Sequence, residues 1–136
     1  MKQIESACLI DDDHIFIFAA KKILLATDIC QNFTIYNNGA DAIEGLSDII
    51  KTGKNVPDLI LLDINMPIMD GWQFLDEFIK IKYPKKVTLY IVSSSIDPVD
   101  IKKAKEYEAI TDFIIKPITR KNLINMVATV FDKEQD

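Results

Sequence analysis

Five short apolar runs alternate along this chain with five stretches in which apolar residues recur at helical spacing. The apolar runs cover residues 7–10, 33–36, 59–62, 87–92 and 113–115. A short run that is apolar throughout is typical of a strand buried on both faces, as in a parallel sheet. Because parallel neighbours need a helical crossover, this alternation predicts an α/β fold with helices on both faces of one sheet.

Local signals mark where the helices begin and end. Gly53 is a C-terminal stop for the second helix. Asp70 and Gln73 have the spacing of a capping box at the third helix, and Asp97 followed by proline is a favoured helix start. Thr119 caps the last helix. The predicted buried faces of the third and last helices comprise Phe74, Leu75, Phe78 and Ile79, and Leu123, Met126, Val127 and Val130.

The strand ends place four polar residues at one edge of the predicted sheet. Right-handed crossovers leave few topologies, and the strand order 2-1-3-4-5 is predicted. In this order Asp11, Asp63, Ser93 and Lys116 stand at the carboxyl ends of the four consecutive strands 1, 3, 4 and 5. Open α/β sheets bind ligands at that edge, so we expect these four side chains to form the functional site.

Composition excludes several classes of protein. A chain of 136 residues is sufficient for one domain with a sizeable core. A formal net charge of -5 argues against nonspecific nucleic-acid binding, which needs a basic surface. No apolar stretch is long enough to span a bilayer, and the first residues lack the apolar region of a secretory signal. We therefore expect no membrane contact. Cys8 and Cys30 lack metal-ligand spacing, which predicts two reduced thiols in a cytoplasmic protein.

The carboxylates at the strand ends predict a metal site. Asp11, Asp12 and Asp63 repel one another, and a bound cation would keep all three ionised. A hard ion with few protein oxygens and several waters favours Mg²⁺. We expect Asp12 and Asp63 to bind it directly and Asp11 through water. Mg²⁺ and Lys116 together balance the three negative charges.

The same arrangement favours phosphoryl transfer. A carboxylate such as Asp63 can attack phosphorus and form an acyl phosphate. Lys116 and the Ser93 hydroxyl would then neutralise and orient the phosphoryl oxygens. The phosphoaspartate carries a charge of about -2, which pulls on both residues. A shift of the Ser93 loop would open space beneath the fourth helix into which Phe113 rotates, and this predicts a conformational switch.

These residues resemble those of a known family. Asp11-Asp12, the segment 63–71 (Asp-Ile-Asn-Met-Pro-Ile-Met-Asp-Gly), Ser93 and Lys116-Pro117 together resemble the receiver domain of bacterial response regulators, over essentially the whole chain. The resemblance implies a flavodoxin-like doubly wound sheet with Asp63 as the phosphoacceptor. It also implies that the Asn65 backbone carbonyl completes the Mg²⁺ site of Asp11, Asp12 and Asp63. Finally, it implies phosphoryl contacts from Ser93 and Lys116, a switch role for Phe113 and a cis bond between Lys116 and Pro117.

The chain departs from the family pattern at three places. Phe113 replaces the usual tyrosine, so no hydroxyl is available after rotation. Glu108-Ala109-Ile110 replaces the common glycine-alanine before the fifth strand. The segment between Ser93 and Lys116 is one residue longer than in the chemotaxis response regulator.

Several other residues have simpler interpretations. Asp13 is predicted to cap the first helix, and Trp72 to pack near the site loop. Asn65 and Ser95 flank the acceptor and are expected to tune attack by water. A lysine cluster on the fourth helix is either a docking patch or a solvated face. Its members are Lys102, Lys103 and Lys105.

The leading functional hypothesis is a stand-alone switch of a two-component phosphorelay. We expect a single receiver domain over 1–136, with a core of about 4–131 and a frayed acidic tail at 132–136. A sensor histidine kinase or histidine phosphotransfer protein would donate the phosphoryl group, and an unknown downstream protein would bind the result. We expect a monomer or weak dimer. We expect no enzymatic activity other than self-phosphorylation from a donor and autodephosphorylation.

Two alternatives remain open. Asp11-x-Asp13 resembles the start of the haloacid dehalogenase-type phosphatases, whose first aspartate is the nucleophile. Ile15 and Phe16 do not supply the threonine expected there, and the chain is short for that fold. The other alternative is a receiver-like scaffold that binds partners without phosphorylation.

Overall fold

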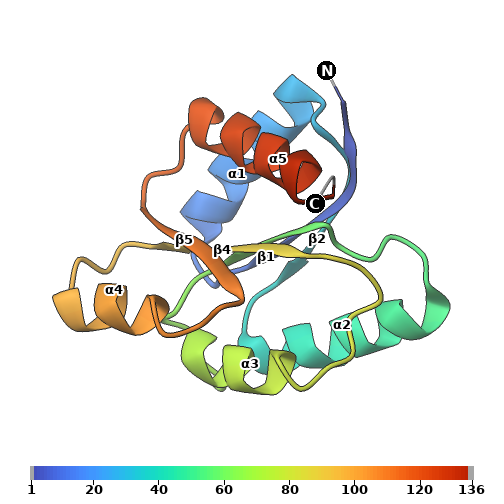
Figure 1. The fold of residues 1–136 in the computed structure, drawn as a ribbon. Helices are drawn as coiled ribbons and strands as arrows, with labels where there is room; N and C mark the ends of the chain where they lie inside the picture. Colours follow the sequence, from blue (N-terminus) through green and yellow to red (C-terminus); the bar gives the residue numbers. More distant parts are fainter. Residues whose placement is uncertain (1, 135–136) are drawn as a thin grey trace.

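The computed structural model describes residues 2–134, with side-chain surroundings through residue 132. Within them the chain forms five strands and five helices in strict alternation (Figure 1). These are β1 (Ile4–Ile10), α1 (His14–Thr27), β2 (Cys30–Tyr36), α2 (Gly39–Thr52), β3 (Leu59–Leu62), α3 (Gly71–Phe78), β4 (Thr88–Ser93), α4 (Pro98–Ala104), β5 (Ile110–Ile115) and α5 (Arg120–Glu134).

The strands form one parallel sheet in the order β2-β1-β3-β4-β5, which confirms the predicted topology. In Figure 1, α1 and α5 cover one face of the sheet, and α2, α3 and α4 lie on the other. Both faces are covered because right-handed crossovers place their helices on opposite faces when the direction of travel reverses, as it does after the step from β1 to β2. The fold is therefore a flavodoxin-like, doubly wound α/β sheet.

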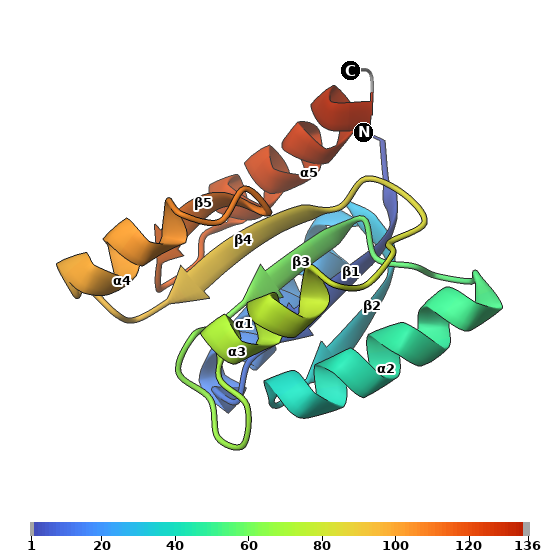
Figure 2. The same ribbon diagram turned by 60° about the horizontal axis from the view of Figure 1, so that its bottom comes forward.

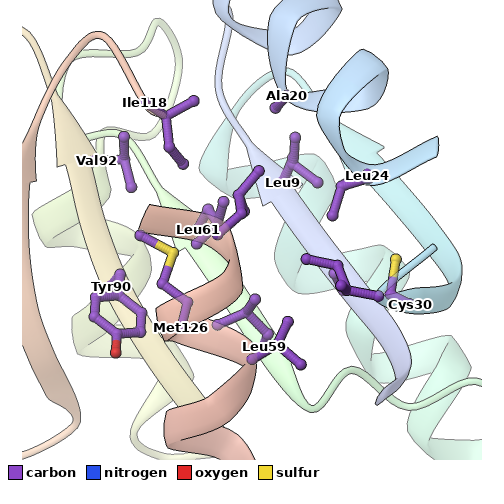
Figure 3. Close-up of a cluster of buried hydrophobic side chains, with 14 of the residues drawn as sticks. Leu9, Ala20, Leu24, Cys30, Leu59, Leu61, Tyr90, Val92, Ile118 and Met126 are labelled. Atoms are coloured by element: carbon purple, nitrogen blue, oxygen red, sulfur yellow. The ribbon is translucent and has the colours of Figure 1, made fainter. Parts of the chain in front are cut away.

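Residue alternation along the strands divides the core into two layers. In β1, Ala7 and Leu9 belong to the layer beneath α1 and α5, whereas Cys8 and Ile10 belong to the layer beneath α2 and α3. Figure 3 shows the first layer, where Leu9, Leu61 and Met126 from three different elements meet. Both faces of the central strands are thus apolar, which is why their sequences are unbroken apolar runs.

Three predicted helix-capping signals are confirmed. Asp70 and Gln73 form a reciprocal capping box at the start of α3. The side chain of Asp97 accepts a hydrogen bond from the backbone N–H of Val99, and proline follows it at the first turn of α4. Gly53 ends α2 with a φ of 72°, a left-handed conformation in which glycine avoids the steric cost of a Cβ.

Some predicted boundaries are wrong. β1 begins at Ile4 and β2 at Cys30, three residues earlier than their apolar runs, because these two residues pair with each other in the sheet. Ile79 is exposed and does not belong to the buried face of α3, since the helix ends at Phe78. α5 continues to Glu134, so the helix extends into the acidic segment 132–136, and the expected fraying of that segment stays a prediction. Residues 135–136 lie outside the described part of the chain.

The two cysteines are free and buried. Burial raises the pKa of the Cys8 thiol to about 12 and that of Cys30 to about 11, the latter also through the charge of Asp28. Both sulfurs therefore stay protonated at neutral pH. Separately, none of the helices within residues 2–134 is both long enough and apolar enough to cross a membrane.

Candidate phosphoryl-acceptor site

The carboxyl ends of the strands bring the predicted site residues to one edge of the sheet. Parallel hydrogen bonding continues just past the strand ends: the N–H of Asp63 donates to the carbonyl of Ile10, and that of Lys116 donates to the carbonyl of Ser93, each at 2.9 Å. Asp11 directly follows Ile10. The arrows of β3 and β4 in Figure 2 end on this same side. The positions are set by the backbone, so the side chains start from a rigid edge.

Three carboxylates meet there. One oxygen each of Asp11, Asp12 and Asp63 can be chosen so that all lie within 4.8 Å of one another. Asp11 and Asp63 are buried and Asp12 is exposed. Burial, followed by the charge of Asp63, raises the pKa of Asp11 to about 7. This acidic triad is capable of binding a metal ion. The charge of such an ion would reduce the repulsion between Asp11 and Asp63 that contributes to the raised pKa of Asp11.

Lys116 supplies the positive charge. Its Nζ lies 2.9 Å from Asp11 Oδ2, 3.3 Å from Asp13 Oδ2 and 3.7 Å from Asp63 Oδ2. Burial alone would lower the pKa of Lys116, but Asp11 above all, with Asp63 and Asp13, raises it. The ammonium also lies over the Phe16 ring, 4.7 Å from its centroid. Lys116 is therefore charged at neutral pH and held within the site.

Asp13 has a contact that its local pattern does not predict. Its side chain accepts hydrogen bonds from the N–H groups of Ile15 and Phe16, which confirms its role as the N-cap of α1. Its second oxygen forms the ion pair with Lys116, 103 residues away in the sequence. A cap is recognisable from the following residues, whereas this ion pair depends on β1 and β5 ending at one edge of the sheet.

Ser93 and Phe113 lie on adjacent strands. Ser93 is fully buried at the end of β4, and its Oγ accepts a hydrogen bond from the N–H of Ser95 at 3.2 Å. Phe113 on β5 is half-buried and pairs in register with Ile91. It lines a cavity of about 200 Å³ beside α4, together with Ile101, Ala104, Lys105, Ile110, Thr111, Asp112 and Ile115. Space for a side-chain movement therefore exists beside Phe113.

Two further predicted features lie in the same region. The Lys116–Pro117 peptide bond is cis. Asn65 is exposed and lies two residues after Asp63, in the loop that connects β3 to α3. The predicted role of its backbone carbonyl as a metal ligand stays a prediction.

Trp72, the second residue of α3, packs against the segment between α4 and β5, as its predicted packing role requires. Its ring stacks on Tyr107 with centroids 5.6 Å apart, and Lys103 lies over it at 4.9 Å. The Tyr107 hydroxyl donates to Asp76 at 2.9 Å. Of the three lysines predicted for the fourth helix, Lys103 thus has a packing role, and Lys105 lies just beyond α4 as its C-cap residue. The sequence did not predict this partner, because Trp72 and Tyr107 are distant along the chain.

The loop after Asp63 contains an unusual backbone conformation. Ile68 has a φ of 68°, and the N–H of Met69 donates to the carbonyl of Pro67 at 2.7 Å. This is a tight γ-turn with a positive φ at its central residue, a rare and strained conformation for a β-branched side chain. The Ile68 side chain is 83% exposed, so little packing offsets that strain.

Replacing Ile68 by glycine is therefore expected to stabilise the protein. Relief of a positive φ gives roughly 1–2 kcal/mol, and the greater freedom of glycine in the unfolded chain offsets about half of it. We expect a gain of about 0.5–1 kcal/mol in the free energy of unfolding, measured by urea denaturation. Ile96→Gly is the matched control, because Ile96 is 73% exposed in a loop but has a negative φ. If both variants lost the same stability, the positive φ of Ile68 would not be destabilising.

Comparison with known proteins identifies the family. A family model described as "Response regulator receiver domain" matches residues 7–128. The chemotaxis protein CheY of Treponema pallidum is 26% identical over 122 residues, which is 90% of this chain and 80% of that protein. The structure of a two-component response regulator from Cytophaga hutchinsonii is 32% identical, with a TM-score of 0.87 and coverage of 96% of this chain and 99% of that one.

Three other similarities are partial or more distant. The sensor histidine kinase CheAY of Helicobacter pylori is 34% identical over 96 residues, 71% of this chain, yet the chain spans 12% of that protein. It spans 37% of the probable C4-dicarboxylate response regulator DctR of Halalkalibacterium halodurans. A chain of the CheX–CheY–BeF3–Mg²⁺ complex from Borrelia burgdorferi has the same fold, at 21% identity, a TM-score of 0.76 and coverage of 93% and 89%. With the family match over most of its length, this chain belongs to the response regulator receiver domain family.

Proposed function

We propose that this receiver domain is a phosphorylatable signalling switch that accepts a phosphoryl group on Asp63. The observation that carries the proposal is the meeting of Asp11, Asp12 and Asp63 within 4.8 Å beside the Lys116 ammonium. Such a site combines a carboxylate nucleophile, a place for a divalent cation and a fixed positive charge.

The residues of the site fit Mg²⁺. Asp11 Oδ2 is buried and forms an ion pair with Lys116, but it accepts no hydrogen bond from the described residues. An all-oxygen donor set with an exposed member, Asp12, suits a hard ion that keeps several waters. Asp11, Asp12, Asp63 and the Asn65 carbonyl would hold the ion, which neutralises charge on the phosphoryl oxygens when bound. The Borrelia complex, which contains Mg²⁺ and a beryllofluoride group, supports this choice.

Asp63 is oriented for attack. Its Oδ1 accepts a hydrogen bond from the N–H of Ile64 at 2.8 Å, and its Oδ2 faces Lys116. We assign Oδ2 as the attacking oxygen because Oδ1 already accepts a backbone hydrogen bond, whereas Oδ2 faces only the Lys116 side chain at 3.7 Å. It forms the bond to phosphorus while the P–N bond of a phosphohistidine breaks, and the imidazole nitrogen keeps that electron pair. Lys116 and the Ser93 hydroxyl then bind the phosphoryl oxygens.

The added charge is proposed to change the β4–α4 region. The acceptor's charge rises to about -2, so the Ser93 hydroxyl is drawn toward it and exchanges its contact with the N–H of Ser95. The cavity beside α4 gives Phe113 room to rotate. Without a hydroxyl, Phe113 acts through packing alone. Asn65 and Ser95 remain our proposed residues for tuning attack by water.

The phosphodonor is proposed to be a sensor histidine kinase or a histidine phosphotransfer protein, since receiver domains interact with histidine kinases. Output then proceeds by contact with another protein, and the domain would act as a monomer or weak dimer. Free thiols support a cytoplasmic location. Asp11 is a weaker candidate nucleophile than Asp63, because it is 1% exposed and paired with Lys116 at 2.9 Å.

Incubation with acetyl phosphate and Mg²⁺, followed by intact-mass measurement, tests the proposal. We expect the mass to rise by one phosphoryl group. A known receiver domain labelled in parallel serves as the positive control. Absence of any gain under conditions that label the control would contradict the proposed function.

The stabilising effect of Mg²⁺ is expected to increase with pH. The pKa of Asp11 is about 7 in the folded protein, above the ordinary aspartate value of 3.8. A raised carboxyl pKa means that the folded state loses stability as pH rises through that window, and Mg²⁺ restores it by binding the ionised form. Below the pKa the affinity for Mg²⁺ should fall by about tenfold per pH unit.

Thermal denaturation with and without Mg²⁺, at about pH 5 and about pH 8, measures this dependence. We expect a clearly larger rise in melting temperature at the higher pH. Asp11→Asn removes the titrating group, and its response to Mg²⁺ should be small at both pH values. Equal stabilisation of the wild type at both pH values would show that Asp11 does not control binding.

A further inference from the structure

The carboxylate of Asp13 uses its two oxygens for two different partners. Oδ1 accepts hydrogen bonds from the N–H groups of Ile15 at 3.0 Å and Phe16 at 3.2 Å, so the residue is fixed to the first turn of α1. Oδ2 lies 3.3 Å from Lys116 Nζ. The capping oxygen Oδ1 thus fixes the Asp13 side chain, and the second oxygen, Oδ2, contacts Lys116.

Lys116 is shared unequally among three carboxylates. Asp11 and Asp13 are its nearer partners, at 2.9 and 3.3 Å, and Asp63 is the farthest, at 3.7 Å. Asp11 and Asp13 hold the nitrogen on their side of the site, so the ammonium must move to bring its third N–H to a phosphoryl group on Asp63. A phosphoryl group on Asp63 would have to draw Lys116 away from Asp11 or from Asp13.

Burial decides which contact is released. The Asp11 side chain is 1% exposed and could not be solvated after losing Lys116. The Asp13 side chain is 42% exposed, so water can replace the lysine there at little cost. A buried carboxylate left without its counter-charge is costly, whereas an exposed one is not.

We propose that Asp13 is a positioning residue that holds Lys116 back from Asp63 and thereby weakens the binding of a phosphoryl group. This inference rests on the proposed function. In the unphosphorylated protein Asp13 retains the lysine, and on phosphorylation Lys116 exchanges Asp13 for the phosphoryl oxygens. The negative charge of Asp13 acts in the same direction, because it repels the incoming group.

The capping role of Asp13 can be separated from its role toward Lys116. Asparagine and serine are helix N-caps as good as aspartate, but neither carries a negative charge. Asp13→Asn and Asp13→Ser should therefore keep α1 intact and release Lys116. Asp97→Asn is the matched control, because Asp97 also caps a helix, through the N–H of Val99, and its loss changes the net charge equally.

The test is the affinity for beryllofluoride, a phosphoryl mimic, measured by calorimetry at saturating Mg²⁺. An ion pair of this exposure is worth a few tenths to one kcal/mol, so Asp13→Asn and Asp13→Ser should each bind about two- to fivefold more tightly than wild type. Asp97→Asn should match wild type. The melting temperature of the metal-free protein should change little in Asp13→Asn, in contrast to Asp13→Ala, which loses the cap.

The outcomes distinguish the two proposals. Tighter binding in both capping variants supports a positioning role. Unchanged or weaker binding in Asp13→Asn and Asp13→Ser, with normal binding by wild type, overturns that role and leaves the phosphoacceptor function intact. A wild-type protein that does not bind beryllofluoride overturns the proposed function, and the role of Asp13 with it.

Discussion

Asp63→Asn is expected to take up no phosphoryl group from acetyl phosphate and Mg²⁺, whereas the wild type gains one. The substitution preserves side-chain shape, and asparagine can still accept the 2.8 Å hydrogen bond from the N–H of Ile64. It removes the anionic oxygen that faces Lys116 at 3.7 Å, and a neutral amide oxygen is a poor nucleophile toward phosphorus. Intact mass after incubation measures the loss, which should be complete within detection.

The control for this experiment is Asp28→Asn. Asp28 ends α1 with a φ of 53°, a conformation that asparagine also adopts readily, and it follows the helix end farthest from the site. This variant should label as the wild type does. Labelling that persists in Asp63→Asn would favour the alternative in which Asp11 is the nucleophile. Loss of labelling in both variants would mean that the assay reports net charge rather than the acceptor.

Gly71→Ala is expected to cost about 3 kcal/mol of unfolding free energy and to reduce phosphoryl uptake as well. A Cβ on Gly71 would lie 2.5 Å from the carbonyl oxygen of Asp63 and 2.7 Å from the Cα of Ile64. Both neighbours are backbone atoms, so the loop cannot yield without moving the acceptor. The N–H of Gly71 also donates to the carbonyl of Ile64 at 3.0 Å, which keeps the two segments close.

Gly45→Ala provides the comparison for this prediction. A Cβ there would meet atoms of the Tyr36 ring, which is a half-buried side chain able to rotate. Within α2, alanine also gains about 1 kcal/mol of helix propensity over glycine. The net change should stay within about 1 kcal/mol, measured by urea denaturation. If Gly71→Ala proved no more destabilising than Gly45→Ala, the close backbone contact at Gly71 would not be limiting.

The elements that the sequence predicted well are those whose signals are local. The capping box of Asp70 and Gln73 spans three residues, and the stop at Gly53 needs a single backbone conformation. Such features are determined by neighbours along the chain, so no knowledge of the fold is required. The strand order was also predictable, because crossovers between parallel strands have one handedness.

The predictions that proved wrong concern residues whose place in a strand, or whose burial, depends on tertiary contacts. Ile4 and Cys30 belong to strands because they pair with each other in the sheet. Cys30 does so although polar residues 31–32 separate it from the apolar run that follows. Ile79 continues the apolar pattern of α3, but the helix ends before it and leaves its side chain exposed. A period in the sequence shows which face is apolar, whereas the sheet and its covering layers decide how far that face is buried.

By itself, the sequence determined that Asp11, Asp63, Ser93 and Lys116 come to one edge of a parallel sheet. It did so because each of them ends an apolar run, and the ends of parallel strands coincide. Only the tertiary structure decided how Lys116 divides its charge among carboxylates. Its contact with Asp13 joins residues 103 positions apart, and a difference of a few tenths of an ångström among three oxygens depends on packing that no local pattern encodes.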